Sequence, residues 1–161
     1  MREIVETVYP VQTMRNEPVI IGVKLLRPDA KVPKLANHGD GAFDLFSVED
    51  LTLEPGARYA VATGISLEIP QGYEGQVRPR SGLALKHGVT VLNAPGTIDS
   101  GYRGEVKSIM INHGREPFKI TKGMRISQLA IRAAPKALFE AVETLEESER
   151  GEGGFGSTGM K

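Results

Sequence analysis

The chain has 161 residues, a length that fits one domain. Lysine plus arginine and aspartate plus glutamate both number 20, so the net charge is zero and the basic surface that binds duplex nucleic acid is not expected. The lack of cysteine excludes disulfides and thiolate chemistry, and the three histidines lack metal-ligand spacing. The apolar runs are too short to span a bilayer, and the N-terminus does not resemble a secretory signal. We therefore predict a cytoplasmic protein.

The first part of the chain is predicted to consist of short strands, since 19 glycines and 10 prolines favour a turn-rich β fold. Residues 1–18 show little periodicity and are interpreted as an N-terminal extension, whereas the apolar run at 19–26 predicts a buried strand. Residues 42–47 alternate and predict a strand that carries Asp44, whose carboxylate needs a partner if it is buried. Two further strand segments are expected to be separated near Gly64.

One convincing helix is predicted after a short strand at residues 74–78. Ser81 is suited to cap its N-terminus, and Gly88 is suited to stop it. Because Arg80 precedes a Ser-Gly pair at this helix start, several N–H groups and a guanidinium are expected to point at one spot, which suits an anion. The alternative is an ordinary capped helix without a ligand.

The stretch from Val91 to Glu105 has an unusual density of functional side chains. Its glycine-bearing corners predict a hairpin, with a turn at Pro95 and Gly96 and a return strand that starts at Tyr102. The alternative interpretation is a solvated hairpin tip. The polar groups that crowd this ribbon are Asn93, Asp99, Tyr102, Arg103 and Glu105.

The remaining strands are predicted at residues 106–112 and 125–133, and a weaker strand at 137–142. About ten short strands with frequent turns suggest a barrel or a jelly-roll-like sheet. The glycine-rich tail at 150–161 cannot fold by itself, and a disordered C-terminus is one interpretation. The other is a phosphate cradle in which the ring of Phe155 stacks on a base.

These pieces, in this order, resemble the five motifs of trimeric deoxyuridine triphosphatases (dUTPases). The matching segments are residues 41–45, 80–88, 96–105, 123–129 and 150–159, so that the resemblance spans residues 19–159. There are departures from the usual motifs. Gly41 and Ala42 stand in the reverse of the usual order, Met124 stands where an acidic residue is usual, and Ser127 stands where alanine is usual.

The resemblance implies an all-β fold, a β-clip or distorted jelly-roll-like barrel with one short helix, in a homotrimer with shared active sites. It divides the chain into an N-terminal extension (1–18), a dUTPase-like β domain (19–145) and a flexible glycine-rich arm (146–161) that closes over a neighbouring active site. The implied reaction is Mg²⁺-assisted hydrolysis of dUTP to dUMP and pyrophosphate. This reaction keeps uracil out of DNA and supplies dUMP for thymidylate synthesis.

The resemblance also implies roles for individual residues. Asp99 is the candidate base, and Asp44 is expected to reach Mg²⁺ through water. Arg103 and Glu105 are interpreted as a salt bridge that holds the hairpin or the trimer axis. The α- and β-phosphates are expected to bind Arg80, Ser81, Gly82 and Gln128. Uracil is expected to bind Asn93 and the hairpin backbone, including Thr97, Ile98 and Lys107, and Tyr102 is expected to lie beneath the deoxyribose, with Asp99 nearby. The tail residues expected to bind substrate are Arg150, Phe155, Gly156, Ser157 and Thr158.

Two other functions remain open from the sequence. A dCTP deaminase shares the expected fold and trimer, but it needs a glutamate base beside its Arg/Ser motif and has no stacking phenylalanine tail. The spacing of Asp99 and Tyr102 and the presence of Phe155 favour the phosphatase. A catalytically idle nucleotide sensor could use the same pocket, although the intact catalytic positions favour an enzyme.

Overall fold

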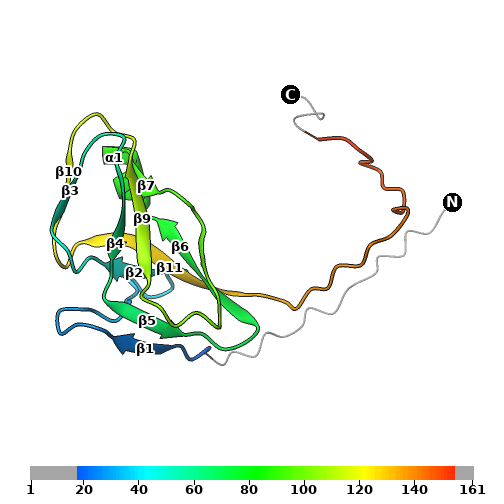
Figure 1. The fold of residues 1–161 in the computed structure, drawn as a ribbon, viewed down its shortest axis with the longest axis horizontal. Helices are drawn as coiled ribbons and strands as arrows, with labels where there is room; N and C mark the ends of the chain where they lie inside the picture. Colours follow the sequence, from blue (N-terminus) through cyan, green and yellow to red (C-terminus); the bar gives the residue numbers. More distant parts are fainter. Residues whose placement is uncertain (1–17, 155–161) are drawn as a thin grey trace.

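Short strands build almost all of the regular structure in the computed structural model, which describes residues 18–154 (Figure 1). In chain order the elements are β1 (Gly22–Leu25), β2 (Phe43–Phe46), β3 (Leu51–Leu53), β4 (Arg58–Ala62), β5 (Ile65–Glu68), β6 (Tyr73–Pro79), α1 (Ser81–His87), β7 (Val89–Val91), β8 (Gly96–Ile98), β9 (Lys107–Asn112), β10 (Phe118–Ile120) and β11 (Arg125–Ala133). The predicted all-β class with one short helix is confirmed. No helix within residues 18–154 has the length and apolar character needed to cross a membrane.

Two larger sheets organise the domain. One has the strand order β2-β11-β6-β8 and the other has the order β4-β9-β7, while β1 pairs with β5 and β3 pairs with β10. All of these pairings are antiparallel. Alternating apolar side chains of the strands meet in one core, whose most deeply buried members include Leu45, Val61, Ile65, Met110, Ile120 and Ile126. The polar side chains that alternate with them along the strands point to the outer surfaces of the sheets.

The helix ends where the sequence predicts, but it begins differently. Gly88 adopts a left-handed φ of 68°, and its N–H is bonded to the carbonyl oxygens of the last turn, which confirms its role as the stop. The predicted cap at Ser81 is wrong. Arg80 occupies the N-cap position with an extended backbone and no side-chain cap bond, because a guanidinium has no acceptor for one. Its guanidinium reaches Asp44 and donates to the carbonyl of Arg125.

Gly88 also lies against the backbone of Gly114 in the turn after β9. A Cβ atom added at Gly88 would stand 2.6 Å from the amide nitrogen of Gly114. The N–H of His113 donates to the carbonyl of Gly88 at 2.9 Å. The end of α1 and this turn are therefore joined through main-chain atoms, with no side chain between them.

Two strand predictions differ from the structure. The run at residues 19–26 is half-exposed, not buried, because β1 pairs only with β5 and leaves Leu25 and Leu26 open to solvent. Residues 137–142 form no strand, since no other part of the described chain lies beside them to pair with their backbone. They belong to an extended arm that leaves the body after β11 (Figure 1). In addition, the short strand β10 was not predicted.

The departures in the fourth motif have local explanations. Ser127 is fully buried, and its hydroxyl lies 2.6 Å from the hydroxyl of Ser108 on β9. A buried hydroxyl needs such a partner, so the serine at position 127 is matched by the serine at position 108. Met124 packs against the core, and its carbonyl accepts a bond from the N–H of Ser47.

Candidate active site

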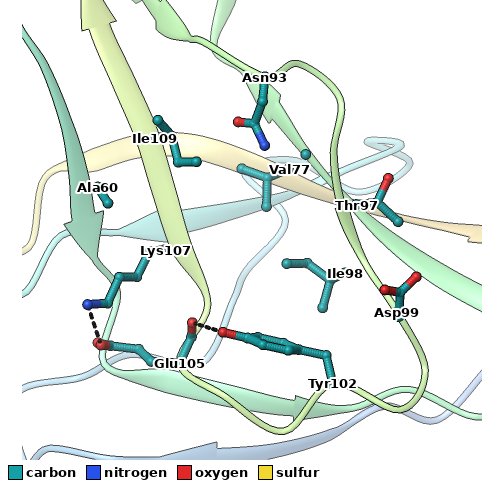
Figure 2. Close-up of a pocket in the computed structure, with 11 residues that line it drawn as sticks. Ala60, Val77, Asn93, Thr97, Ile98, Asp99, Tyr102, Glu105, Lys107 and Ile109 are labelled. Atoms are coloured by element: carbon teal, nitrogen blue, oxygen red, sulfur yellow. Dashed lines mark hydrogen bonds and ion pairs between the residues drawn. The ribbon is translucent and has the colours of Figure 1, made fainter.

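A pocket of about 620 Å³ opens between β8 of the first sheet and strands β4 and β9 of the second (Figure 2). It gathers six of the residues that the sequence assigned to substrate: Asn93, Thr97, Ile98, Asp99, Tyr102 and Lys107. Its other lining residues are Ala60, Val77, Gly96, Glu105 and Ile109. An amide, a carboxylate, a phenol and an ammonium group therefore share one concave site with apolar walls, as is usual for small-molecule sites.

The predicted hairpin is replaced by a longer connection between the two sheets. Strand β8 pairs with β6, whereas β9 pairs with β4 and β7, so β8 and β9 are not paired with each other. Residues 102–105 form a loop because local bonds fold them back. The N–H of Tyr102 donates to the carbonyl of Asp99 at 3.0 Å, and the guanidinium of Arg103 donates to the carbonyl of Ser100 at 2.7 Å.

Within β8, alternation sends Ile98 towards the space between β8 and β9 and Thr97 to the other side (Figure 2). Asn93, in the turn before the strand, points to the same side as Ile98, and Asp99, just after it, points to the same side as Thr97 (Figure 2). Room for the Asn93 amide depends on Gly96, since a Cβ atom there would stand 3.1 Å from its Nδ2. The pocket thus offers an amide inside and a carboxylate at its rim.

Asp44, Arg80 and Arg125 form a second group of polar residues. The Asp44 carboxylate is buried and lies 3.2 Å from Nε of Arg80 and 3.0 Å from Nη1 of Arg125. The expectation that a buried Asp44 needs a partner is confirmed. Gln128 is opposite Asp44 in the pairing of β11 with β2, and it lines a shallow groove with Gly41.

The second group is separate from the pocket of Figure 2. Neither Asp44 nor Arg80, Ser81, Gly82 or Gln128 lines that pocket, and Ser81 and Gly82 form the start of α1. Arg150 is in the arm, where its Nε donates to the carbonyl of Gly153 at 2.7 Å. The other tail residues expected to bind substrate, Phe155, Gly156, Ser157 and Thr158, lie outside the described residues. One chain therefore places the predicted binding residues in two separate groups.

The donor set fits a Mg²⁺ ion held chiefly by phosphate and water. Within residues 18–154, no three His, Asp or Glu side chains come together as ligands. A Mg²⁺ ion in a nucleotide site keeps several waters and needs few carboxylates. Oδ1 of Asp44 is buried and is ion-paired with Nε of Arg80 at 3.2 Å, without a well-aligned hydrogen bond in the described part of the chain. Because a carboxylate oxygen has two lone pairs, Asp44 can also accept a bond from a metal-bound water.

Within one chain, the predicted salt bridge between Arg103 and Glu105 is wrong. Arg103 lies 3.7 Å from Glu68, and the Glu105 carboxylate lies 3.6 Å from Nζ of Lys107. The two side chains diverge because the loop turns between them. The other carboxylate oxygen of Glu105 accepts the N–H of Gly64 at 2.9 Å.

Sequence reasoning missed the apolar walls of the pocket. Val77 on β6 is buried, whereas Ile109 alternates with the buried Met110 on β9 and is half-buried on the pocket side, and Ala60 lies on the neighbouring β4. Strand alternation could have predicted that Val77 is buried, but not that Val77, Ile109 and Ala60 lie beside Asn93. The proximity of these apolar residues to Asn93 depends on which strands pair, and the sequence alone does not give that pairing.

The fold and its pocket define an all-β protein with a small-molecule site, and comparison with known proteins identifies a family of hydrolases of nucleotide metabolism. The dUTPase family model matches residues 28–159. The chain belongs to the dUTPase family.

Individual relatives agree with this assignment. The deoxyuridine 5'-triphosphate nucleotidohydrolase of Clostridium tetani is 56% identical over 137 residues, which cover 85% of this chain and 94% of that protein. The enzyme of the same name from Clostridium acetobutylicum is 53% identical over 143 residues, which cover 89% and 99%.

Solved structures show the same fold. The dUTPase of Staphylococcus bacteriophage 80alpha, solved with dUPNHPP, has a TM-score of 0.82 at 31% identity and covers 87% of this chain and 98% of its own. A mutant dUTPase from phage phi11 of S. aureus, described with a coordinated structural Mg(II) ion, has a TM-score of 0.74 at 25% identity and covers 80% and 99%.

Proposed function

We propose that this protein is a dUTP diphosphatase, which hydrolyses dUTP to dUMP and pyrophosphate. The observation that carries the proposal is the pocket of Figure 2, which joins Asn93, Asp99 and Tyr102 around β8 in a chain of the dUTPase family. Acting in the cytoplasm, the reaction would keep uracil out of DNA and supply dUMP for thymidylate synthesis.

Substrate selection is assigned to the inner part of this pocket. The Asn93 amide and the backbone groups of Thr97 and Ile98 would form hydrogen bonds with the amide edge of uracil. A cytosine in that place would leave those groups unpaired, which is a strong source of discrimination. The ring of Tyr102 would lie beneath the deoxyribose and leave no space for a 2′-hydroxyl, and the backbone of Lys107 would border the base.

Catalysis is assigned to Asp99 at the rim of the pocket. Its carboxylate would accept a proton from a water molecule as the water oxygen bonds to the α-phosphorus. The bond between the α-phosphorus and the bridging oxygen breaks, and pyrophosphate leaves. A bound Mg²⁺ would neutralise charge on the phosphate oxygens, and Asp44 would accept hydrogen bonds from its water ligands.

The phosphates are assigned to residues that this pocket lacks. Arg80, Ser81, Gly82 and Gln128 would bind the α- and β-phosphates. Arg150 and the tail residues Ser157 and Thr158 would bind the γ-phosphate, with Phe155 and Gly156 closing over the base.

We further propose that active sites are shared in a homotrimer. The separation of the pocket from the group around Asp44 supports this, because a neighbouring chain can supply the missing half of each site. The arm gives independent support. Its apolar side chains are exposed, with Phe139 fully so, and such surface is normally covered by a partner. The exposed members are Leu138, Phe139, Val142 and Leu145.

The experiment that tests the function compares release of pyrophosphate and of ammonia from dUTP, dCTP, dTTP and UTP in parallel. The proposal predicts pyrophosphate from dUTP far above the other three nucleotides, and dependence on Mg²⁺. Ammonia from dCTP would instead assign the chain to the deaminases. Binding of dUTP without any product would assign it to the sensors.

A further inference from the structure

The loop at residues 99–106 holds Tyr102 without the support of strand pairing. The ring of Tyr102 is 44% exposed, so packing alone does not fix it. Two contacts define its position. Its hydroxyl donates to the carbonyl of Glu105 at 3.0 Å (Figure 2), and the ring lies against Gly104, where an added Cβ atom would stand 2.9 Å from Cε2. The ring therefore follows the backbone of residues 104 and 105.

That backbone is tied to the turn between β4 and β5 by the side chain of Glu105. One carboxylate oxygen accepts the N–H of Gly64, which is 41 positions away in the sequence, at 2.9 Å. The other oxygen lies 3.6 Å from Nζ of Lys107, and the side chain is only 24% exposed. A charged acceptor with this degree of burial forms a stronger hydrogen bond than a neutral one.

The anchoring turn is packed into the core. Its neighbours Thr63 and Ile65 are buried, as is Val106 at the end of the loop. The N–H of Val106 donates to the carbonyl of Ile65 at 2.9 Å, and the hydroxyl of Thr63 donates to the carbonyl of Val106. Glu105 thus connects an exposed loop to a buried and hydrogen-bonded part of the core.

We propose that Glu105 is a positioning residue for sugar selection: by holding its own backbone on Gly64, it fixes the ring of Tyr102 in the place that excludes a 2′-hydroxyl. The inference rests on the proposed function, in which Tyr102 lies beneath the deoxyribose. Glu105 itself contacts no substrate in this scheme. Its effect passes through the backbone carbonyl that receives the tyrosine hydroxyl.

The test measures kcat/KM for dUTP and for UTP and takes the ratio of the first to the second. A variant that only loses part of its folded protein lowers both values equally and leaves this ratio unchanged. Glu105→Ala should lower the ratio by about fivefold or more, since it removes a charge-assisted bond. Glu105→Gln keeps an acceptor for Gly64 and should stay within about twofold of wild type. Glu68→Ala is the matched control, because Glu68 pairs with Arg103 of the same loop on its exposed side.

A double-mutant comparison makes the test specific. If Glu105 acts through Tyr102, the variant with both Glu105→Ala and Tyr102→Ala should have the same ratio as Tyr102→Ala alone. Should Glu105→Ala fail to fold, Glu105→Asp keeps the charge but withdraws the carboxylate from the N–H of Gly64 by one methylene, and it should also lower the ratio.

The outcomes separate the inference from the proposed function. The positioning role is overturned if the ratio falls in Tyr102→Ala but stays at wild type in Glu105→Ala, or in Glu105→Asp where that variant replaces it. Additive effects in the double variant overturn it as well. An unchanged ratio in Tyr102→Ala overturns the assignment of the tyrosine to the sugar, and with it this inference. A wild-type protein that hydrolyses neither nucleotide overturns both proposals.

Discussion

The buried carboxylate of Asp44 gives the sharpest prediction about stability. Asp44→Asn preserves shape but removes the charge that two arginines share. Loss of one partner from a fully buried ion pair costs about 3–5 kcal/mol, whereas exposed pairs contribute about 0–1 kcal/mol. Here the aspartate is 4% exposed, but the side chains of Arg80 and Arg125 are 25% and 46% exposed and can turn towards water. We therefore expect a loss of about 2–3 kcal/mol in the free energy of unfolding.

The assay is denaturant unfolding without nucleotide at one fixed protein concentration, since assembly links stability to concentration. Asp29→Asn is the matched control, because Asp29 forms a similar 2.9 Å pair with Arg27 on the surface, and its unfolding midpoint should equal that of wild type. The same midpoint for Asp44→Asn and wild type would refute the reasoning, because it would mean that the group around Asp44 is solvated in the assembled protein.

Other variants test the remaining assignments. Asp99→Asn should retain dUTP binding but lose turnover, because only the proton acceptor is removed; near-normal kcat would contradict its role. Deletion of residues 151–161 should leave the fold intact and abolish activity, and mixing this chain with Asp99→Asn should restore some activity if sites are shared. No recovery in proven mixed trimers would place tail and pocket in one subunit. Asn112→Ala should lower stability by about 2–4 kcal/mol, because its fully buried side chain loses three hydrogen bonds, one of them buried and two partly buried. Asn37→Ala, at an exposed turn, should have no such effect.

The features that could be predicted from the sequence depend on short-range chemistry. The β-strand with Asp44 follows from alternation, and its need for a partner follows from the cost of burying a charge. The identity of that partner was not predictable, because Arg125 is 81 positions away and meets Asp44 only through the pairing of β2 with β11.

The errors share a cause, which is that local pattern does not determine pairing. The residues after Ile98 have hairpin character, yet β8 pairs with β6, and the return run is folded back by bonds to Asp99 and Ser100. Ser81 is a good cap by type, but Arg80 occupies that position and its guanidinium contacts Asp44. The pairing of β8 with β6 and the contact of Arg80 with Asp44 are long-range features that local preference does not encode.

The back-to-back arrangement of Gly88 and Gly114 has a consequence for the divergence of related sequences. A collision between two side chains can be relieved by shortening one of them, so compensating substitutions are common in cores. Here a new side chain at either position meets main-chain atoms of the other segment, which no second substitution can shorten. The collision can be relieved only if the two backbones lie further apart. We therefore expect relatives that lack one of these glycines to differ in the length of the turn between β9 and β10.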